Sequence, residues 1–245
     1  MRPNASTSDG LSELAVAGLT VRYGGVTALD DVALRVAPGR IVGLIGPNGA
    51  GKTTLINAVT GVVRPSSGTI ALGATRLAGL APHRIARAGI ARTYQNVRLF
   101  ARLAVGDNVR AGAYRQARTL GDTEILELLA RTGATERDLR RRAGALPYGE
   151  QRRLELARAL AARPAVLLLD EPAAGMNPRE TRALGTTIAS VARDGIGVLL
   201  VEHDMTLVAA VCDTVVVLNF GRVIATGTPQ EIARDPAVIE AYLGA

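Results

Sequence analysis

One segment of the sequence has the residue types and spacing that bind a chain of phosphates. Residues 46–53 spell Gly-Pro-Asn-Gly-Ala-Gly-Lys-Thr, the pattern GxxxxGK[ST]. Glycines let such a loop aim successive backbone N–H groups at phosphate oxygens, and the following helix adds the partial positive charge of its N-terminus. The ammonium of Lys52 suits the β- and γ-phosphates, and the Thr53 hydroxyl suits Mg²⁺. We therefore predict a nucleotide site formed by Gly46, Asn48, Gly49, Ala50, Gly51, Lys52, Thr53 and Thr54.

Two adjacent carboxylates add the chemistry of hydrolysis. Asp170 and Glu171 directly follow the apolar run 166–169, which is typical of a buried parallel strand. Nucleotides bind at the carboxyl edge of such sheets. We expect Asp170 to hold Mg²⁺, directly or through water, and Glu171 to act as the general base for water that attacks the γ-phosphate. An N-cap after a strand is the alternative use of these acids, but it leaves the upstream phosphate loop unexplained.

The lysine of this loop is the only lysine in the chain, among 29 Lys and Arg residues. A planar guanidinium fits poorly where a compact ammonium is needed, so Lys52 is the basic residue that arginine should replace least well. The net charge of +7 and the pI of about 10.4 would suit nucleic acid or an anionic membrane surface. The arginines are scattered, however, and the run 140–142 is expected to face solvent. We expect no nucleic-acid partner.

Length and composition indicate a folded chain with a full core. It has 245 residues, of which 48% are hydrophobic. A single cysteine, Cys212, forms no internal disulfide, and we expect it to lie in the core. Residues 1–10 lack the apolar segment of a signal peptide, and we expect a frayed tail there. The apolar runs are far shorter than the roughly 20 residues that span a bilayer.

The elements that must position these groups alternate between strand and helix patterns. Residues 13–45 follow the period of strands, and a helical pattern follows Gly51 as far as Val62. From residue 105 to about 162 the period is helical, which indicates a helical insert. Strands are then expected at 166–169, 197–201 and 214–218, with helices at 178–193 and after Asp204, its N-cap. The pattern predicts an α/β fold with a parallel sheet.

With three further residues, the order of the motifs resembles that of the ATP-binding cassette (ABC) ATPases. The resemblance extends from about Leu14 to the C-terminus. Tyr23 stands where the family has an aromatic residue that stacks on adenine. Gln95 follows a strand expected at 90–93 and matches the Q-loop, and His203 matches the switch histidine that contacts the γ-phosphate. The resemblance implies ATP and Mg²⁺. It implies that Lys52, Gln95, Glu171 and His203 are catalytic, and that Thr53, Gln95 and Asp170 contact the metal.

The family's signature loop, usually LSGGQ, corresponds to residues 146–150, Leu-Pro-Tyr-Gly-Glu, before a helix expected at 153–162. In the family this loop caps the ATP of the opposite subunit. The resemblance therefore implies contacts in trans from Pro147, Tyr148, Gly149 and Glu150. Pro147 lacks the usual serine hydroxyl, and Asn177 replaces the D-loop aspartate. Backbone N–H groups and the helix dipole still favour an anion there.

The resemblance also implies an architecture. We expect a P-loop NTPase core with a parallel sheet, an N-terminal antiparallel β portion and an inserted helical subdomain. The expected boundaries are 1–94 and 164–245 for the ATP-binding core and 95–163 for the helical signature subdomain. Because the family sandwiches each ATP between two subunits, one cassette implies a dimer with an identical or a sister ATPase.

Longer segments narrow the resemblance to the ATPase subunits of branched-chain amino-acid importers. This implies membrane permease subunits as partners, indirectly a substrate-binding protein, and a place at the cytoplasmic face of the bacterial inner membrane. Importers of urea or short amides have much of the same sequence in these segments. The spacing of the motifs alone supports only an ABC-type NTPase. The segments are RTYQNVRLF (92–100), LPYGEQRRLELARAL (146–160), DEPAAGMNP (170–178), VEHDM (201–205) and PAVIEAYLG (236–244).

Alternatives from other classes fit less well. A nucleic-acid-associated ABC ATPase would carry two cassettes, or a long coiled coil between the phosphate loop and the signature, and the sequence has neither. A P-loop kinase needs an acceptor pocket, whereas Tyr23, Gln95, Glu171 and His203 favour water as the acceptor. Two interpretations of Phe100 stay open: a buried connector into the helical insert, or part of a docking groove for a membrane subunit's helix.

Overall fold

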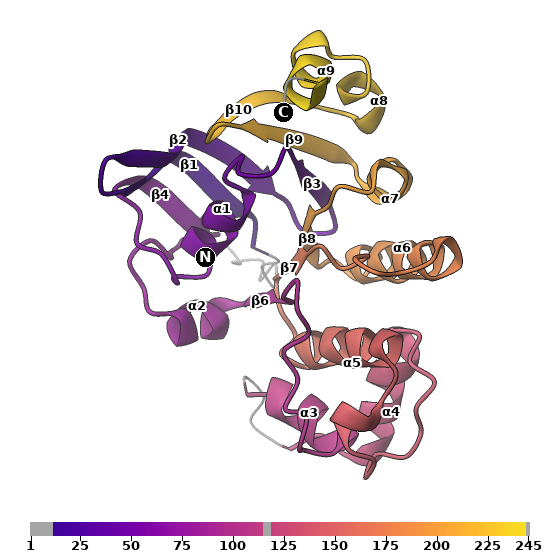
Figure 1. Cartoon of the computed structure of the whole chain (residues 1–245). Helices are drawn as coiled ribbons and strands as arrows, with labels where there is room; N and C mark the ends of the chain where they lie inside the picture. Colours follow the sequence, from indigo (N-terminus) through magenta and orange to yellow (C-terminus); the bar gives the residue numbers. More distant parts are fainter. Residues whose placement is uncertain (1–11, 115–118, 244–245) are drawn as a thin grey trace, which may run out of the picture.

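A six-stranded sheet forms the centre of the computed structural model, which describes residues 12–114 and 119–243 (Figure 1). The tail expected at residues 1–10 lies outside the described residues. The strand order is β10-β9-β3-β8-β7-β6, parallel except for β10. The expected parallel sheet is therefore confirmed. The bounds are Ile41–Ile45 (β3), Ile90–Arg92 (β6), Val166–Asp170 (β7), Gly197–Val201 (β8), Thr214–Asn219 (β9) and Arg222–Gly227 (β10).

Strands β3, β7 and β8 are buried at all five of their positions, because helices and the second sheet cover both faces. Their carboxyl ends meet at one edge of the sheet. The chain that leaves β3 there is the phosphate loop, β7 ends in Asp170, and β8 is followed by Glu202 and His203. The topology thus gathers the expected catalytic groups.

A four-stranded antiparallel sheet, ordered β2-β1-β4-β5, packs beside the central one and confirms the expected N-terminal β portion. Alternate residues of β1, among them Leu14 and Val16, point into the core. The period of residues 13–45 predicted β1 and β2 but not the two later strands of this sheet. The bounds are Leu14–Tyr23 (β1), Val26–Val36 (β2), Ser67–Leu72 (β4) and Thr75–Arg76 (β5).

Helices of the core lie on both sides of the central sheet (Figure 1). The first ends at Val59, three residues earlier than its pattern predicted, because Gly61 takes a left-handed φ of 74° that stops the helix. Val62 is 59% exposed as a result. The bounds are Lys52–Val59 (α1), Pro82–Ala88 (α2), Pro178–Arg193 (α6), Met205–Val211 (α7), Pro229–Ile232 (α8) and Pro236–Leu243 (α9).

The helical insert contains α3 (Val105–Gly112), α4 (Asp122–Arg131), a short 3₁₀ turn (Ala143–Ala145) and α5 (Tyr148–Ala161). These helices share a hydrophobic cluster of their own, with Val109, Ile125 and Leu154 among its members. Helix α5 begins five residues before the expected Arg153, with Pro147 as its N-cap. Its first turn is polar, so apolar periodicity did not reveal it. No helix of the described residues has the length and apolar character needed to cross a membrane.

Candidate functional site

The phosphate loop leaves β3 through Gly46, where only glycine fits. Gly46 has a φ of 148°, and a Cβ atom there would lie 2.0 Å from the carbonyl oxygen of Leu218. The loop then enters α1, whose first turn has no side-chain cap. The N–H groups at the start of α1 are therefore available to an anion. Asn48, Gly49 and Thr53 are exposed at this surface.

The side chain of Lys52 lies inside the loop and is 8% exposed. Its Nζ donates to the carbonyl oxygens of Gly46, at 2.5 Å, and Pro47, at 2.9 Å. Burial lowers the pKa of Lys52, although the negative charges of Glu171 and Asp170 act against this. The lone lysine thus lies where two carboxylates face it and where phosphates can replace the carbonyl partners.

Asp170 is paired with an arginine that the sequence reasoning missed. Arg92 Nη2 lies 2.8 Å from Asp170 Oδ2, and both side chains are less than 10% exposed. Arg92 Nη1 also donates to Oδ1 of Asn57 in α1, over 2.7 Å. The pair therefore fixes the orientation of the carboxylate at the end of β7. The available signal was the position of Arg92 at the end of a strand, beside the motif with Gln95.

Glu171 is the meeting point of the expected catalytic groups. Its Oε2 accepts a hydrogen bond from Gln95 Nε2 at 2.7 Å and lies 3.4 Å from His203 Nε2. Its backbone N–H donates to the carbonyl oxygen of Val201 in β8, and its φ is 47°. A left-handed φ is unusual for a glutamate and is a form of strain that gathers at functional sites.

Glu202 supports this arrangement and was also not assigned from the sequence. It is 2% exposed, and its Oε1 accepts from Ala173 N at 2.8 Å while Oε2 accepts from His203 N at 3.1 Å. Burial raises the pKa of Glu202, and these backbone hydrogen bonds act against the rise. It ties the loop after Glu171 to the loop that carries His203. As expected, Asp204 caps α7 by accepting from Thr206 N and Leu207 N.

A pocket of about 890 Å³ opens at the phosphate loop, between residues 46–50, His203, the β9–β10 hairpin and α9. Helix α9 contributes Glu240 and Tyr242, and Tyr242 has a hydrogen bond with the backbone of Gly46. The sequence pattern predicted helical structure here but not its place beside the loop. Tyr23, the expected adenine contact, is 50% exposed at the end of β1, and Thr54 is half-buried in α1.

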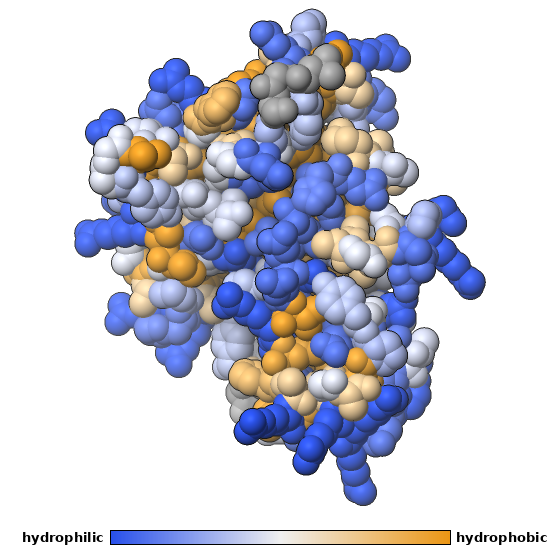
Figure 2. All heavy atoms as spheres, viewed as in Figure 1, coloured by the Kyte–Doolittle hydropathy of each residue, from blue (hydrophilic) through white to orange (hydrophobic). Residues whose placement is uncertain are grey.

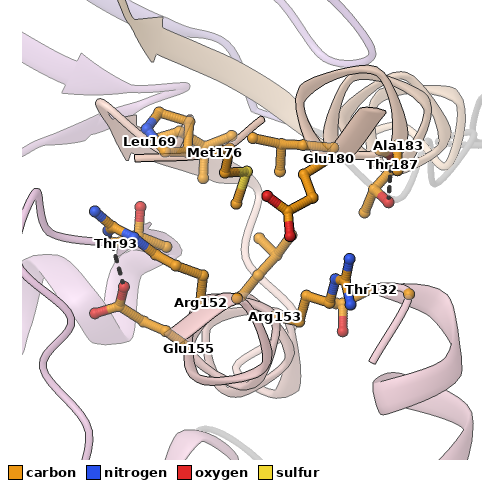
Figure 3. Close-up of a pocket in the computed structure, with 15 residues that line it drawn as sticks. Thr93, Thr132, Arg152, Arg153, Glu155, Leu169, Met176, Glu180, Ala183 and Thr187 are labelled. Atoms are coloured by element: carbon orange, nitrogen blue, oxygen red, sulfur yellow. Dashed lines mark hydrogen bonds and ion pairs between the residues drawn. The ribbon is translucent and has the colours of Figure 1, made fainter. Parts of the chain in front are cut away.

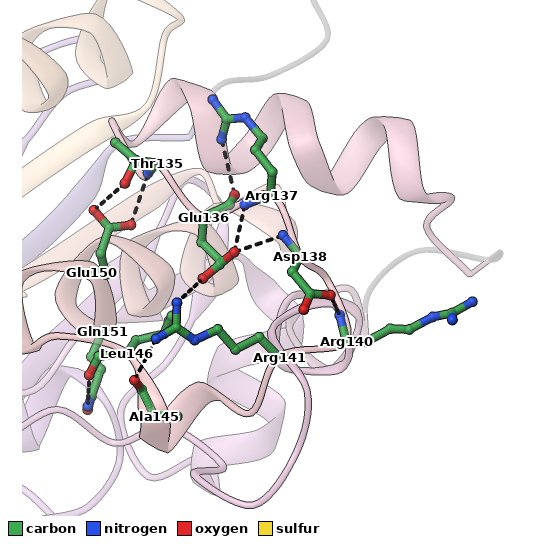
Figure 4. A network of polar contacts seen from close by, with 10 residues as sticks. All are labelled: Thr135, Glu136, Arg137, Asp138, Arg140, Arg141, Ala145, Leu146, Glu150 and Gln151. Atoms are coloured by element: carbon green, nitrogen blue, oxygen red, sulfur yellow. Dashed lines mark hydrogen bonds and ion pairs between the residues drawn. The ribbon is translucent and has the colours of Figure 1, made fainter.

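The signature segment lies apart from the phosphate loop of its own chain, since α5 and α1 occupy different parts of the molecule (Figure 1). Tyr148 is 49% exposed. The Glu150 carboxylate accepts from Thr135 N and Oγ1 and pairs with Arg153, so it is turned into its own subdomain (Figure 4). A Cβ on Gly149 would meet only Glu180 Oε1, at 3.7 Å. No contact among residues 12–114 and 119–243 requires glycine there.

The comparisons with known proteins decide the family. Residues 29–174 match the family model described as ABC transporter. The chain belongs to the ABC transporter ATP-binding family. Residues 222–245 of the cassette match a second model, described as Branched-chain amino acid ATP-binding cassette transporter. The resemblance and the fold predicted from the sequence are both confirmed.

Relatives of this cassette match nearly its whole length. It is 44% identical to the high-affinity branched-chain amino acid transport ATP-binding protein BraF of Pseudomonas aeruginosa, over 94% of this chain and 97% of that protein. It is 43% identical to LivG of Escherichia coli, which has the same description, with the same shares covered. The solved structure of MJ1267, an ATP-binding cassette of an ABC transporter in its ADP conformation, is 27% identical. It covers 96% of this chain and 99% of its own, with a TM-score of 0.83.

Proposed function

We propose that this cassette is the ATP-hydrolysing subunit of an importer for branched-chain or related amino acids. Support for the cargo comes from the relatives' descriptions and from the match of residues 222–245. The main support for ATP hydrolysis is that Gln95 and His203 both contact Glu171, near Lys52. A transporter subunit of this kind works at the cytoplasmic face of the bacterial inner membrane.

Glu171 acts as the general base. Its carboxylate takes a proton from the water that attacks the γ-phosphate, while the Gln95 amide and the His203 ring hold it in place. His203 also faces the γ-phosphate. When ATP binds, Lys52 Nζ leaves the carbonyl oxygens of Gly46 and Pro47 and donates to phosphate oxygens. Tyr23 stacks on adenine.

The residues fit a Mg²⁺ ion that arrives with ATP. Within residues 12–114 and 119–243, no cluster of three or more His, Cys, Asp or Glu forms a metal site. Mg²⁺ suits such a place because it takes one or two protein oxygens together with substrate phosphates. Thr53, Gln95 and Asp170 are the residues that would hold it. The ion would neutralise charge that develops on the phosphates.

The signature segment serves the second subunit of a dimer, either identical or a sister ATPase. Helix α5 begins without a side-chain cap, which leaves backbone N–H groups at its start for an anion. Glycine at position 149, which no contact in the described part of the chain requires, allows a close approach from outside. Pro147, Tyr148, Gly149 and Glu150 thus form the trans face, and Glu150 contributes its backbone there because its carboxylate is held by Thr135 and Arg153. The separate cluster of α3–α5 supports 95–163 as a subdomain between the core parts 1–94 and 164–245.

The change Glu171→Gln tests the hydrolytic role. It keeps the shape of the side chain and removes the base, so we expect ATP to bind while turnover falls by about 10²-fold or more. The variant should also remain dimeric in ATP, which size-exclusion chromatography detects. Glu13→Gln, at a surface ion pair with Arg35, is the matched control. Normal steady-state turnover of Glu171→Gln would remove Glu171 from the mechanism.

A groove of about 390 Å³ is the proposed docking site for a helix of the membrane subunit. Val62, Phe100 and Tyr114 supply exposed apolar surface, and Arg158 and His83 add basic groups. Figure 2 shows apolar side chains gathered over the loop between β6 and α3. Phe100 is 52% exposed, so the interpretation as a buried connector is wrong. An amphipathic helix fits such a groove.

Phe100→Asp tests the docking. A carboxylate in an apolar groove must be desolvated when a helix packs on it, so association with the membrane subunits should be lost while fold and ATP binding remain. Phe220→Asp changes the other phenylalanine, which is 87% exposed, and should leave association intact. Co-purification from membranes measures both. Retained association of Phe100→Asp would move the docking surface elsewhere. The ligand of the co-purifying binding protein would test the cargo.

A further inference from the structure

Three charged side chains lie along one face of α5, and two of them, Arg152 and Glu155, are buried. Arg152, Glu155 and Arg158 are spaced three residues apart, and their side chains are 4%, 1% and 16% exposed. Burial raises the pKa of Glu155, against hydrogen bonding by Arg98 N and the charge of Arg158, and burial lowers the pKa of Arg158. Burying such groups costs free energy, which well-placed hydrogen-bond partners must offset.

Arg152 and Glu155 bind backbone groups of the segment 94–98, which is neither helix nor strand, whereas Arg158 pairs with Glu155. Arg152 Nη1 donates to the carbonyl oxygen of Tyr94 over 2.6 Å, and Nη2 donates to that of Gln95. Glu155 Oε1 accepts from Arg98 N at 3.0 Å. The planar fork of a guanidinium is suited to two neighbouring acceptors. One helix therefore fixes the backbone of this segment at three residues.

The side chain held in this way is Gln95, whose amide reaches Glu171 over 2.7 Å. The reach of that amide depends on where the backbone of Gln95 lies. A displacement of about 1 Å at a reacting group can cost about 100-fold in rate. The hydrogen bond from Arg152 to the Gln95 carbonyl therefore helps to set the position of the Gln95 amide at Glu171.

The same guanidinium also lies 5.3 Å from the ring centroid of Tyr148 in the signature segment. This distance is within the range of a cation–π contact. Figure 3 shows Arg152 extending from α5 toward Glu155 and Thr93, whereas Arg153 turns the other way. One side chain thus touches the signature segment on one side and the backbone of Gln95 on the other.

We propose that Arg152 is a positioning residue that holds Gln95 at Glu171 and ties this hold to the signature segment. The proposal rests on the proposed roles of Gln95 and Glu171 in hydrolysis. In the dimer, the signature segment lies against the nucleotide of the partner subunit. A shift of Tyr148 there moves Arg152, and with it the carbonyl that sets the position of Gln95.

Arg152→Lys tests the hold, because it keeps the charge but replaces the fork with one ammonium. We expect kcat to fall about tenfold with an unchanged Kd for ATP. Backbone amides of residues 94–98 should exchange hydrogen faster. Added to Gln95→Ala, Arg152→Lys should lower kcat no further, because both act through one amide. Arg110→Lys makes the same exchange at a side chain that pairs with Asp107 and Asp122 in the same subdomain and touches neither segment, so it should leave kcat unchanged.

The tie to the signature segment has its own measurement. In the nucleotide-free chain, Tyr148→Gly should speed exchange at residues 94–98 when Arg152 is present but not in the Arg152→Lys background. If Tyr148→Gly speeds exchange equally with Arg152 and with Arg152→Lys, Arg152 does not link the signature segment to residues 94–98.

Other outcomes overturn the positioning role. An unchanged kcat of Arg152→Lys would do so, as would effects of Arg152→Lys and Gln95→Ala that multiply. Loss of ATP affinity at an unchanged kcat would show a merely structural role. Absence of ATP hydrolysis by the unaltered chain would refute the proposed function instead. Hydrogen exchange would then still test whether Arg152 holds residues 94–98. If it does not, the amides of these residues should exchange at the same rate in the Arg152→Lys and Arg110→Lys variants.

Discussion

At the scale of single residues, the sequence indicated groups whose type suits the proposed chemistry. Lys52, Asp170, Glu171 and His203 stand in motifs at strand ends, and the parallel sheet brings strand ends to one edge. It did not identify Arg92 or Glu202. Each works through a partner far along the chain, Asp170 for Arg92 and Ala173 for Glu202, and spacing carries no record of such pairs.

Lys52→Arg tests the lone lysine. The ammonium is buried between two carbonyl oxygens at 2.5 and 2.9 Å, where a planar guanidinium does not fit. We expect ATP turnover to fall at least about tenfold, equal to about 1.4 kcal/mol in the barrier. Steady-state kinetics and ATP titration measure the effect. The opposite exchange on the surface, Arg35→Lys, should change neither, and an undiminished rate of Lys52→Arg would contradict the site.

At the scale of elements, periodicity located strands and helices but not all of their ends. The pattern of 178–193 gave α6 its observed bounds, because Asn177 and Pro178 mark its start. The start of α5 was missed because its first turn buries little apolar surface. Strand β4 was missed because its pairing with β1 is long-range, and β5, which pairs with β4, was missed because its two residues are too few to show a period. The assignment of the signature residues remains a prediction.

The cap of α6 gives a prediction at this scale. The Asn177 side chain accepts from Arg179 N and Glu180 N, and the Glu180 carboxylate accepts from Asn177 N. Asn177→Ala removes this cap and should lower the free energy of unfolding by about 1 kcal/mol. Asn177→Asp restores the family's usual residue and should keep stability within a few tenths, since aspartate caps equally well. Urea unfolding distinguishes them, and an equal loss in both would contradict the capping role.

At the scale of the whole molecule, the apolar residues pack into separate clusters between sheets and helices. Composition predicted that the core would be large, but not how it divides into clusters. Cys212 lies in the cluster between the central sheet and α6–α7, as expected, and is a free thiol. The arginines at 140–142 are exposed, also as expected. The identity of the chains that meet the signature segment and the groove at Phe100 is set by those chains and not by this sequence.

Burial raises the pKa of Cys212 from 9.0 to about 12. Between these values the unfolded chain loses the thiol proton and the folded chain keeps it, so stability falls as pH rises. From pH 8 to 10 the unaltered chain should lose about 1.4 kcal/mol more free energy of unfolding than Cys212→Ala. Urea unfolding at both pH values measures the difference. Parallel losses in the two proteins would show that the thiol titrates normally.

The left-handed backbone of Glu171 has a consequence for engineering. A glutamate with a φ of 47° carries a conformational cost of roughly 1–3 kcal/mol, which glycine at the same place would largely avoid. Directed evolution that screens only for heat resistance would therefore favour loss of the carboxylate that we propose as the general base. A library built on this cassette needs a turnover screen in every round, or its most robust members will be inert.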